Sequence, residues 1–133
     1  MGKRVLFVCT GNACRSPMAE GIARALGIAA ESAGVLAAGV QPSAVRVLAE
    51  KGIDIAGHRS RTVPDVRGRF DVVVTLCGYA QSIFPDAPPS RERLHWAVED
   101  PITSVGSDRE LAEFRRARDE IEGLIRANLG RLT

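Results

Sequence analysis

The 133-residue sequence lacks a large charge of either sign and lacks any apolar run long enough to cross a membrane. Its formal net charge of +2 is too small to indicate a nucleic acid or a membrane surface as a partner. The first residues, MGKRVLFVCTG, begin with basic side chains, but the apolar part that follows is short. This segment is typical of a first strand rather than of a signal peptide, so we expect a cytoplasmic protein.

Cysteine and histidine are also scarce. Three cysteines are an odd number and too few for a secreted disulfide scaffold, which favours a reducing compartment and thiols that are free to react. The sequence has no Cys-x-x-Cys pair, and its two histidines, His58 and His95, lie far apart along the chain. A structural zinc site is therefore not expected, and we predict neither a metal nor a cofactor.

No linker, internal repeat or low-complexity segment divides the chain, and its length suits a single catalytic domain over residues 1–133, which we expect to be monomeric. Strand-like apolar runs cover residues 4–8, 29–34, 70–76 and 93–98. We expect a first helix that is capped by Ser16 and has Pro17 in its first turn. A second helical pattern covers residues 43–51. A long final helix is predicted where Ser107 and Glu110 have capping-box spacing. This alternation predicts an α/β fold with a parallel sheet and helices on both of its faces.

The segment VCTGNACRSPMAE joins the first predicted strand to the first predicted helix. Ligands of parallel sheets bind beyond the carboxyl ends of the strands, where backbone N–H groups and a helix N-terminus favour an anion. Arg15 adds a guanidinium that suits a tetrahedral oxyanion, and the positive surroundings favour the thiolate form of Cys9 beneath it. Ser16 can donate a hydrogen bond to that sulfur, Asn12 can brace the loop, and Gly11 can supply an unusual backbone angle. The predicted oxyanion-binding residues are Thr10, Gly11, Asn12, Ala13, Cys14 and Arg15. The plainer interpretation, a buried cysteine in a tight turn, explains fewer of these residues.

The loop resembles the phosphate loop of the low-molecular-weight protein-tyrosine phosphatase superfamily. The resemblance extends to SAG at 32–34, GIDIAGHRS at 52–60 and the Asp-Pro pair at 100–101. It implies a three-layer α/β fold with a central four-stranded parallel sheet. It also implies Cys9 as the nucleophile, Arg15 as the oxyanion-binding residue, Ser16 as the residue that stabilises the thiolate, and Asp100 as the general acid.

The superfamily has two branches, and an additional cysteine separates them, because arsenate reductases resolve a thiol–arsenate adduct with a second thiol. Cys77, in VVVTLCGYA, follows the clearest buried strand at the same edge of the sheet as Cys9. The segments TLC, HWAVEDP and EFRRARDEI resemble the thioredoxin-coupled arsenate reductases. This resemblance favours an arsenate reductase with a redox-active Cys9–Cys77 disulfide. A packing role for Cys77 is the alternative, since buried cysteine is a common small hydrophobe.

Three positions depart from the reductase pattern. Phe84 occupies the position of the usual relay cysteine, so the electrons have to come directly from thioredoxin, glutaredoxin or a low-molecular-weight thiol. Pro17 is more typical of the phosphatases. Arg61 stands where reductases with a potassium site have an acidic residue, and we expect its guanidinium to replace the cation by pairing with Glu20. Cys14 is the remaining thiol, and it could protect Cys9 by reversible pairing.

Aromatic residues make up only 5% of the sequence, which bears on the alternative function. A phosphotyrosine ring needs aromatic walls to stack on, and Ile102 and Thr103 replace the tyrosines that follow Asp-Pro in phosphatases. An inorganic oxyanion needs no such walls. The sequence thus predicts an arsenate reductase. A phosphatase acting on phosphomonoesters is the alternative, and an idle oxyanion-binding or redox-sensing domain is a third interpretation.

Overall fold

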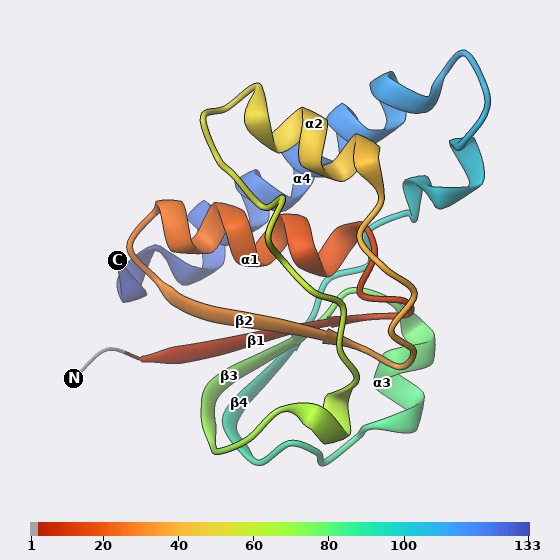
Figure 1. Ribbon diagram of the computed structural model, residues 1–133. Coiled ribbons are helices and arrows are strands. Elements are labelled where there is room, and N and C mark those ends of the chain that lie inside the picture. The colour runs from red at the N-terminus through yellow and green to blue at the C-terminus, as the bar shows by residue number, and fades with distance from the viewer. Residues whose placement is uncertain (1–2) are drawn as a thin grey trace.

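The computed structural model describes residues 3–133 and has a four-stranded parallel sheet at its centre (Figure 1). The strands are β1 (Arg4–Cys9), β2 (Ala29–Gly34), β3 (Phe70–Thr75) and β4 (Ser90–His95), in the order β2-β1-β3-β4. The chain adds β2 on one side of β1 and β3 on the other. The carboxyl ends of β1 and β3 therefore meet at the point where the strand order reverses, which is where open α/β sheets bind ligands.

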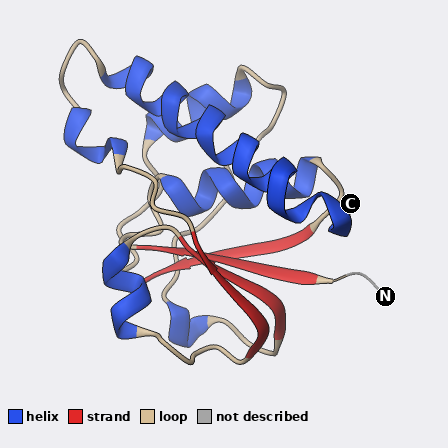
Figure 2. Ribbon diagram, turned by 180° about the vertical axis from the view of Figure 1, so that it is seen from behind, coloured by secondary structure: helices blue, strands red, loops and turns tan. Residues whose placement is uncertain are grey.

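Helices cover both faces of the sheet, as predicted (Figures 1 and 2). One face carries α1 (Arg15–Ala25), α2 (Pro42–Ala49) and the long α4 (Glu110–Leu129). The other face carries the short α3 (Gly78–Ile83) and the turn η1 (Val63–Asp65). Two further 3₁₀ turns are η2 (Pro101–Ser104) and η3 (Gly130–Leu132).

The strand β1 shows why the sheet needs cover on both faces. Val5 and Phe7 belong to the core beneath α1, α2 and α4, whereas Leu6 and Val8 belong to the core beneath α3 and η1. All four side chains are at most 1% exposed. Successive side chains of a strand point to opposite faces, so a strand buried on both sides is apolar throughout, without alternation.

The predictions for the strands are confirmed for three of the four. The prediction for the fourth strand is wrong by three residues, because β4 spans Ser90–His95 and not residues 93–98. As an edge strand it is buried only in part, and its apolar signal is weak. Trp96 and Val98, which suggested a strand, are buried as loop residues over the carboxyl end of the sheet.

The predictions for the helix starts need correction as well. The helix α1 begins at Arg15, one residue before the expected cap. The hydroxyl of Ser16 contacts Cys9 Sγ and Asn12 Nδ2 and does not cap the helix. The helix α2 ends at Ala49, two residues earlier than predicted. Ser107 and Glu110 do not form a capping box for α4: Ser107 Oγ accepts from Arg109 N–H, and Glu110 accepts from Gly106 N–H.

Within residues 3–133, no helix combines the length and apolar character that a membrane span requires.

Candidate active site

The loop Cys9–Arg15 turns its carbonyl oxygens outward. Backbone N–H groups of residues 35–41, which run alongside, donate to the carbonyls of Cys9, Thr10, Gly11 and Ala13 over 2.8–3.1 Å. The hydroxyl of Ser60 donates to the carbonyl of Asn12 over 2.6 Å. In a trans peptide the N–H points away from the C=O of the same unit. The N–H groups of residues 10–14 therefore face the interior of the loop, where they form a cradle for an anion.

The left-handed backbone angle that the loop needs falls on Asn12, with φ 48°, and not on Gly11 as predicted. Asparagine tolerates this region better than most residues do. A different glycine is required by close approach: a Cβ on Gly34 would lie 2.6 Å from the backbone nitrogen of Asn12. The SAG segment at 32–34 therefore ends in glycine because the loop packs directly against the end of β2.

The predicted nucleophile, Cys9, is 2% exposed at the base of the loop. Its Sγ lies 2.8 Å from Ser16 Oγ, and Asn12 Nδ2 lies 2.8 Å from the same hydroxyl oxygen. Because the amide of Asn12 donates to Ser16, the hydroxyl hydrogen of Ser16 is available to Cys9. The geometry therefore suits the predicted roles of Ser16 as the donor to the sulfur and of Asn12 as the brace.

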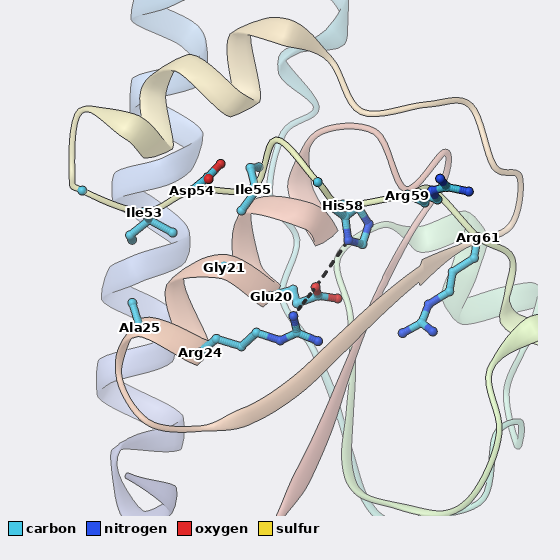
Figure 3. A pocket seen from close by; sticks show the side chains of 12 residues that line it. Glu20, Gly21, Arg24, Ala25, Ile53, Asp54, Ile55, His58, Arg59 and Arg61 are labelled. Atoms are coloured by element: carbon cyan, nitrogen blue, oxygen red, sulfur yellow. Dashed lines mark ion pairs between the residues drawn. The ribbon is translucent and has the colours of Figure 1, made fainter.

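Behind the loop, Glu20 and His58 form a buried pair, and His58 contacts Asn12. Figure 3 shows the Glu20 and His58 side chains with a dashed line between them. His58 Nε2 lies 3.0 Å from Asn12 Oδ1, and His58 Nδ1 lies 3.3 Å from Glu20 Oε2. An amide oxygen only accepts, so Nε2 must carry a hydrogen. Burial alone would raise the pKa of Glu20, but the hydrogen bond and charge of His58 and the charge of Arg24 bring that pKa below its ordinary value. A continuous chain of polar contacts thus links Glu20 to Cys9.

The expected pairing of Arg61 with Glu20 is wrong. Arg61 Nη2 lies 2.9 Å from Glu31 Oε1, and the backbone N–H of Arg61 donates to Asn12 Oδ1 over 3.0 Å. His58 and Arg24 already contact Glu20, and Glu31 on β2 pairs with both Arg61 and Arg4. In the part of the chain that the structure describes, no group of three or more His, Cys, Asp or Glu side chains is arranged to hold a metal ion.

Arg15 and the predicted general acid Asp100 meet across the mouth of the loop. Arg15 Nη2 lies 3.0 Å from Asp100 Oδ2, and Nη1 donates to the carbonyls of Leu76 and Val98 over 3.1 and 2.9 Å. Arg15 Nε is buried and has no hydrogen-bond partner. The two carbonyls hold the guanidinium in place, which the sequence could not show because they lie 61 and 83 residues away.

Cys77 lies beside the loop at the end of β3, as predicted. Its Sγ accepts from Thr10 Oγ1 and from Ala80 N–H, both over 3.3 Å. Thr10 directly follows Cys9, so this contact brings the second thiol to the residue next to the nucleophile. From the sequence, Thr10 was expected to bind the oxyanion, and no local pattern indicated the contact of its hydroxyl with Cys77.

The whole chain has known counterparts. Residues 4–133 match the model of the low molecular weight phosphotyrosine protein phosphatase family. The chain belongs to this family. An arsenate reductase of Halalkalibacterium halodurans is 47% identical over an alignment of 127 residues that covers 91% of each chain. A structure of an arsenate reductase in the phosphate-binding state has a TM-score of 0.82 at 33% identity and covers 98% of this chain and 99% of its own. A low molecular weight protein tyrosine phosphatase from T. tengcongensis has a TM-score of 0.80 at 35% identity and covers 98% and 100%.

In this member of the low molecular weight phosphatase family, the thiols of Cys9 and Cys77 open into different cavities. Cys9 lines a cavity of about 210 Å³ together with Cys14, Leu36 and Ile102. Cys77 lines a cavity of about 400 Å³ together with Ala97 and Glu99. Arg15 and Asp100 line both, so their ion pair lies between the two cavities.

A third cavity, of about 780 Å³, lies behind the loop and contains neither Cys9 nor Cys77. It is lined by Glu20, His58 and three arginines, Arg24, Arg59 and Arg61 (Figure 3). Its volume exceeds that of the other two, yet the predicted catalytic groups lie elsewhere, so we assign the chemistry to the cavities around Arg15.

Cys14 is buried in the first cavity at 3% exposure. Burial raises the pKa of its thiol well above the ordinary range, and the nearby Asp100 and Cys9 raise it further, while Arg15 lowers it. The thiolate form of Cys14 is therefore disfavoured. Because thiol–disulfide chemistry proceeds through the thiolate, Cys14 is poorly suited to the protective pairing considered from the sequence.

Proposed function

We propose that this protein is an arsenate reductase that converts arsenate to arsenite with Cys9 as the nucleophile and Cys77 as the resolving thiol. The observation that carries the proposal is the hydrogen bond between Thr10 and Cys77, which holds a second thiol beside the anion-binding loop. Relatives that are 42–47% identical and named arsenate reductases support the choice of substrate.

The first step is common to both branches of the family. The inward N–H groups of residues 10–14 and the guanidinium of Arg15 bind the oxyanion above the Cys9 sulfur. The Cys9 sulfur attacks arsenic and an As–O bond breaks. Asp100 supplies the proton with which the displaced oxygen leaves as water. Ser16 stabilises the sulfur as a thiolate before the attack.

The second step separates reduction from hydrolysis. The Cys77 sulfur attacks the Cys9 sulfur, and the S–As bond breaks with both electrons passing to arsenic. Arsenic(V) becomes arsenic(III) and leaves as arsenite, while the two thiols are oxidised to the Cys9–Cys77 disulfide. The sulfur atoms must approach to about 2 Å, with Cα atoms within roughly 7 Å, so we expect the segment around α3 to shift.

The alternative function is hydrolysis of phosphomonoesters through a phosphocysteine. It needs the same loop and Asp100, and the family contains phosphatases such as the one from T. tengcongensis. Among the described residues that line the Cys9 cavity, however, none is aromatic. Leu36 and Ile102 at its mouth offer an apolar edge but no ring for a phosphotyrosine to stack on.

We test the proposal by counting free thiols with mass spectrometry before and after one addition of arsenate to the reduced protein. We expect two thiols to disappear and to map to Cys9 and Cys77. Cys77→Ser should abolish arsenate turnover and leave hydrolysis of p-nitrophenyl phosphate largely intact, because hydrolysis does not use the second thiol. Equal loss of both activities would contradict the proposal and assign Cys77 to packing. Absence of any turnover would instead favour an idle binding domain.

A further inference from the structure

We infer that the large cavity behind the loop is a binding site for an α-amino acid with a large apolar side chain. The cavity has a volume of about 780 Å³ and contains neither Cys9 nor Cys77. The inference goes beyond the proposed function and does not depend on it, because the oxyanion and both reacting thiols lie outside this cavity.

A buried carboxylate with an unpaired oxygen lines the middle of the cavity (Figure 3). The side chain of Glu20 is 8% exposed, and its Oε2 lies 3.3 Å from both His58 Nδ1 and Arg24 Nη1. Among the described residues, none forms a hydrogen bond with the other oxygen, Oε1. A buried acceptor without a donor is costly, and a ligand that supplies the donor recovers this free energy. The site therefore favours a ligand that carries a hydrogen-bond donor.

The charge of Glu20 indicates which donor fits best. Burial would raise the pKa of Glu20, but the hydrogen bond and charge of His58 and the charge of Arg24 bring that pKa below its ordinary value. The carboxylate is therefore ionised at neutral pH. Hydrogen bonds between an ammonium and a carboxylate are shorter and stronger than those between neutral groups, so an ammonium is preferred to a hydroxyl or an amide.

The arginines on one side of Glu20 provide for a carboxylate. Figure 3 shows Arg59 and Arg61 on this side. Arg61 is paired with Glu31, whereas within residues 3–133 the exposed guanidinium of Arg59 forms no ion pair. Guanidinium groups bind carboxylates through two parallel hydrogen bonds, so Arg59 is suited to the carboxylate of a ligand.

The other side of Glu20 is largely apolar. Ile53 and Ala25 lie there in Figure 3, and Ile55 lies close by and is 7% exposed. The carboxylate of Asp54, in the same segment, accepts a hydrogen bond from Ala56 N–H over 2.9 Å. An apolar side chain of the ligand would be removed from water against the two isoleucines, which favours binding.

The order of these groups matches that of an α-amino acid. One carbon of such a molecule carries a carboxylate, an ammonium and a side chain, and the cavity presents Arg59, Glu20 and the isoleucines in the corresponding order. A volume of about 780 Å³ lies in the range of small-molecule sites and leaves room for a side chain as large as an indole. A simple amine would leave Arg59 without a partner, and a simple carboxylate would leave Glu20 Oε1 without a donor.

The site lies two contacts from the loop that carries the nucleophile. His58 lies beside Glu20 through Nδ1 and beside Asn12 Oδ1 through Nε2, over 3.0 Å to the latter. An ammonium on Glu20 therefore changes the electric field at His58 and, through it, at Asn12. The side-chain amide of Asn12 reports whether the site is occupied, although Asn12 does not line the cavity.

The test is a titration of the reduced, ¹⁵N-labelled protein with L-tryptophan, followed by NMR. We expect saturable shifts of the backbone signals of residues 20–25 and 52–61 and of the side-chain amide of Asn12. Shifts confined to residues 9–15 would place the ligand in the oxyanion loop and overturn the inference. Absence of saturable binding below about 10 mM would overturn it as well. Failure of arsenate to oxidise Cys9 and Cys77 would contradict the proposed function and leave this result unaffected.

Two fragments of the same molecule test the assignment of the charges. Tryptamine lacks the carboxylate and indole-3-propionate lacks the ammonium, and each should bind about tenfold more weakly than L-tryptophan. Equal affinities of the three compounds would show that the indole alone is bound, which would overturn the assignment to an α-amino acid.

Arg59→Ala tests the position of the carboxylate. We expect the variant to bind L-tryptophan about fivefold more weakly and to bind tryptamine as the unmodified chain does, because tryptamine has no carboxylate to lose. Arg126→Ala removes another exposed arginine, on α4 and outside the cavity lining, and should change neither affinity. An equal effect of Arg59→Ala on both compounds, or no effect on either, would overturn the assigned position.

A filled cavity tests the apolar end. Ala25 is exposed near the end of α1, so Ala25→Phe can place a ring in the cavity without disturbing the core, and it should weaken binding of L-tryptophan about tenfold. Ala112→Phe makes the same change at an exposed position of α4 and should leave the affinity unchanged. Equal affinities of the two variants would overturn the assignment of the cavity.

Discussion

Single residues carry charge into the interior beneath the loop. Glu20 is 6% exposed, and one of its carboxylate oxygens, Oε1, is buried without a hydrogen-bond partner. The other, Oε2, contacts His58 and Arg24. His58 in turn holds Asn12, which holds Ser16. A buried carboxylate is tolerated only while its cationic partners remain, so the brace behind the nucleophile depends on the ionisation of Glu20.

Glu20→Gln tests this dependence through pH. Because the pKa of Glu20 is lowered on folding from its usual 4.5, its charge stabilises the protein above that pH, and the contribution is lost as the pH falls through the folded-state pKa. We expect the variant to lose about 2 kcal/mol of unfolding free energy at pH 7 and less at pH 4. Urea unfolding of the variant and of the unmodified chain at the two pH values measures this loss of free energy.

The exposed Glu120, which pairs with Arg116 on α4, supplies the control. Glu120→Gln should cost less than about 1 kcal/mol at either pH. A loss for Glu20→Gln that is the same at pH 7 and pH 4 would show that shape, and not charge, explains the role of Glu20.

At the scale of elements, the end of β2 and the phosphate loop form one packed unit. The loop carbonyls take their hydrogen bonds from residues 35–41, directly after β2, and Gly34 leaves no room for a side chain beside Asn12. The strand therefore shapes the loop from the side, although it carries none of the predicted catalytic residues.

Gly34→Ala should move the loop, because the new Cβ would meet backbone atoms that cannot rotate away. We expect a loss of about 1–3 kcal/mol in unfolding free energy and at least a tenfold loss of turnover. Gly123→Ala makes the same change within α4, where nothing lies within 4 Å, and should stabilise the helix by about 0.5–1 kcal/mol with turnover unchanged. Thermal unfolding and arsenate turnover of both variants measure this. Normal turnover in Gly34→Ala would contradict the packing argument.

The sequence predicted those elements whose signal is local. The buried strands and the Cys9–Arg15 loop are contiguous patterns, so their places along the chain could be recognised directly. The pairing of Glu20 with His58, the carbonyls that hold Arg15, and the contact of Thr10 with Cys77 join residues 38 to 83 positions apart, and no local pattern encodes them. The prediction of β4 failed for a related reason. Loop residues that are buried over the end of a sheet can be as apolar as strand residues.

At the scale of the whole molecule, the strand order brings the loop Cys9–Arg15, which follows β1, and the thiol of Cys77, which follows β3, to one edge of the sheet. Both groups follow central strands, so the most buried part of the fold determines their spacing. The assignment of residues 1–133 to a single catalytic domain remains a prediction from the sequence, and residues 1–2 lie outside the described part of the chain.

We expect phosphate to inhibit arsenate reduction competitively, with a Ki within about tenfold of the KM for arsenate, because the cradle contacts only the oxygens of a tetrahedral anion. Steady-state rates at several phosphate concentrations measure this. A Ki more than a hundredfold above the KM would require a group that recognises the central atom itself.

The outward carbonyls of the loop have a consequence for selectivity. Because neighbouring segments hold the loop in its binding shape, it cannot adjust to the small difference in size between two otherwise equivalent anions. Discrimination then has to follow binding: an adduct that accepts two electrons proceeds to product, and one that cannot accept them waits for water. On the proposed mechanism, the protein distinguishes arsenate from phosphate by the fates of the two adducts, because only the arsenic adduct can accept the electrons of the second thiol.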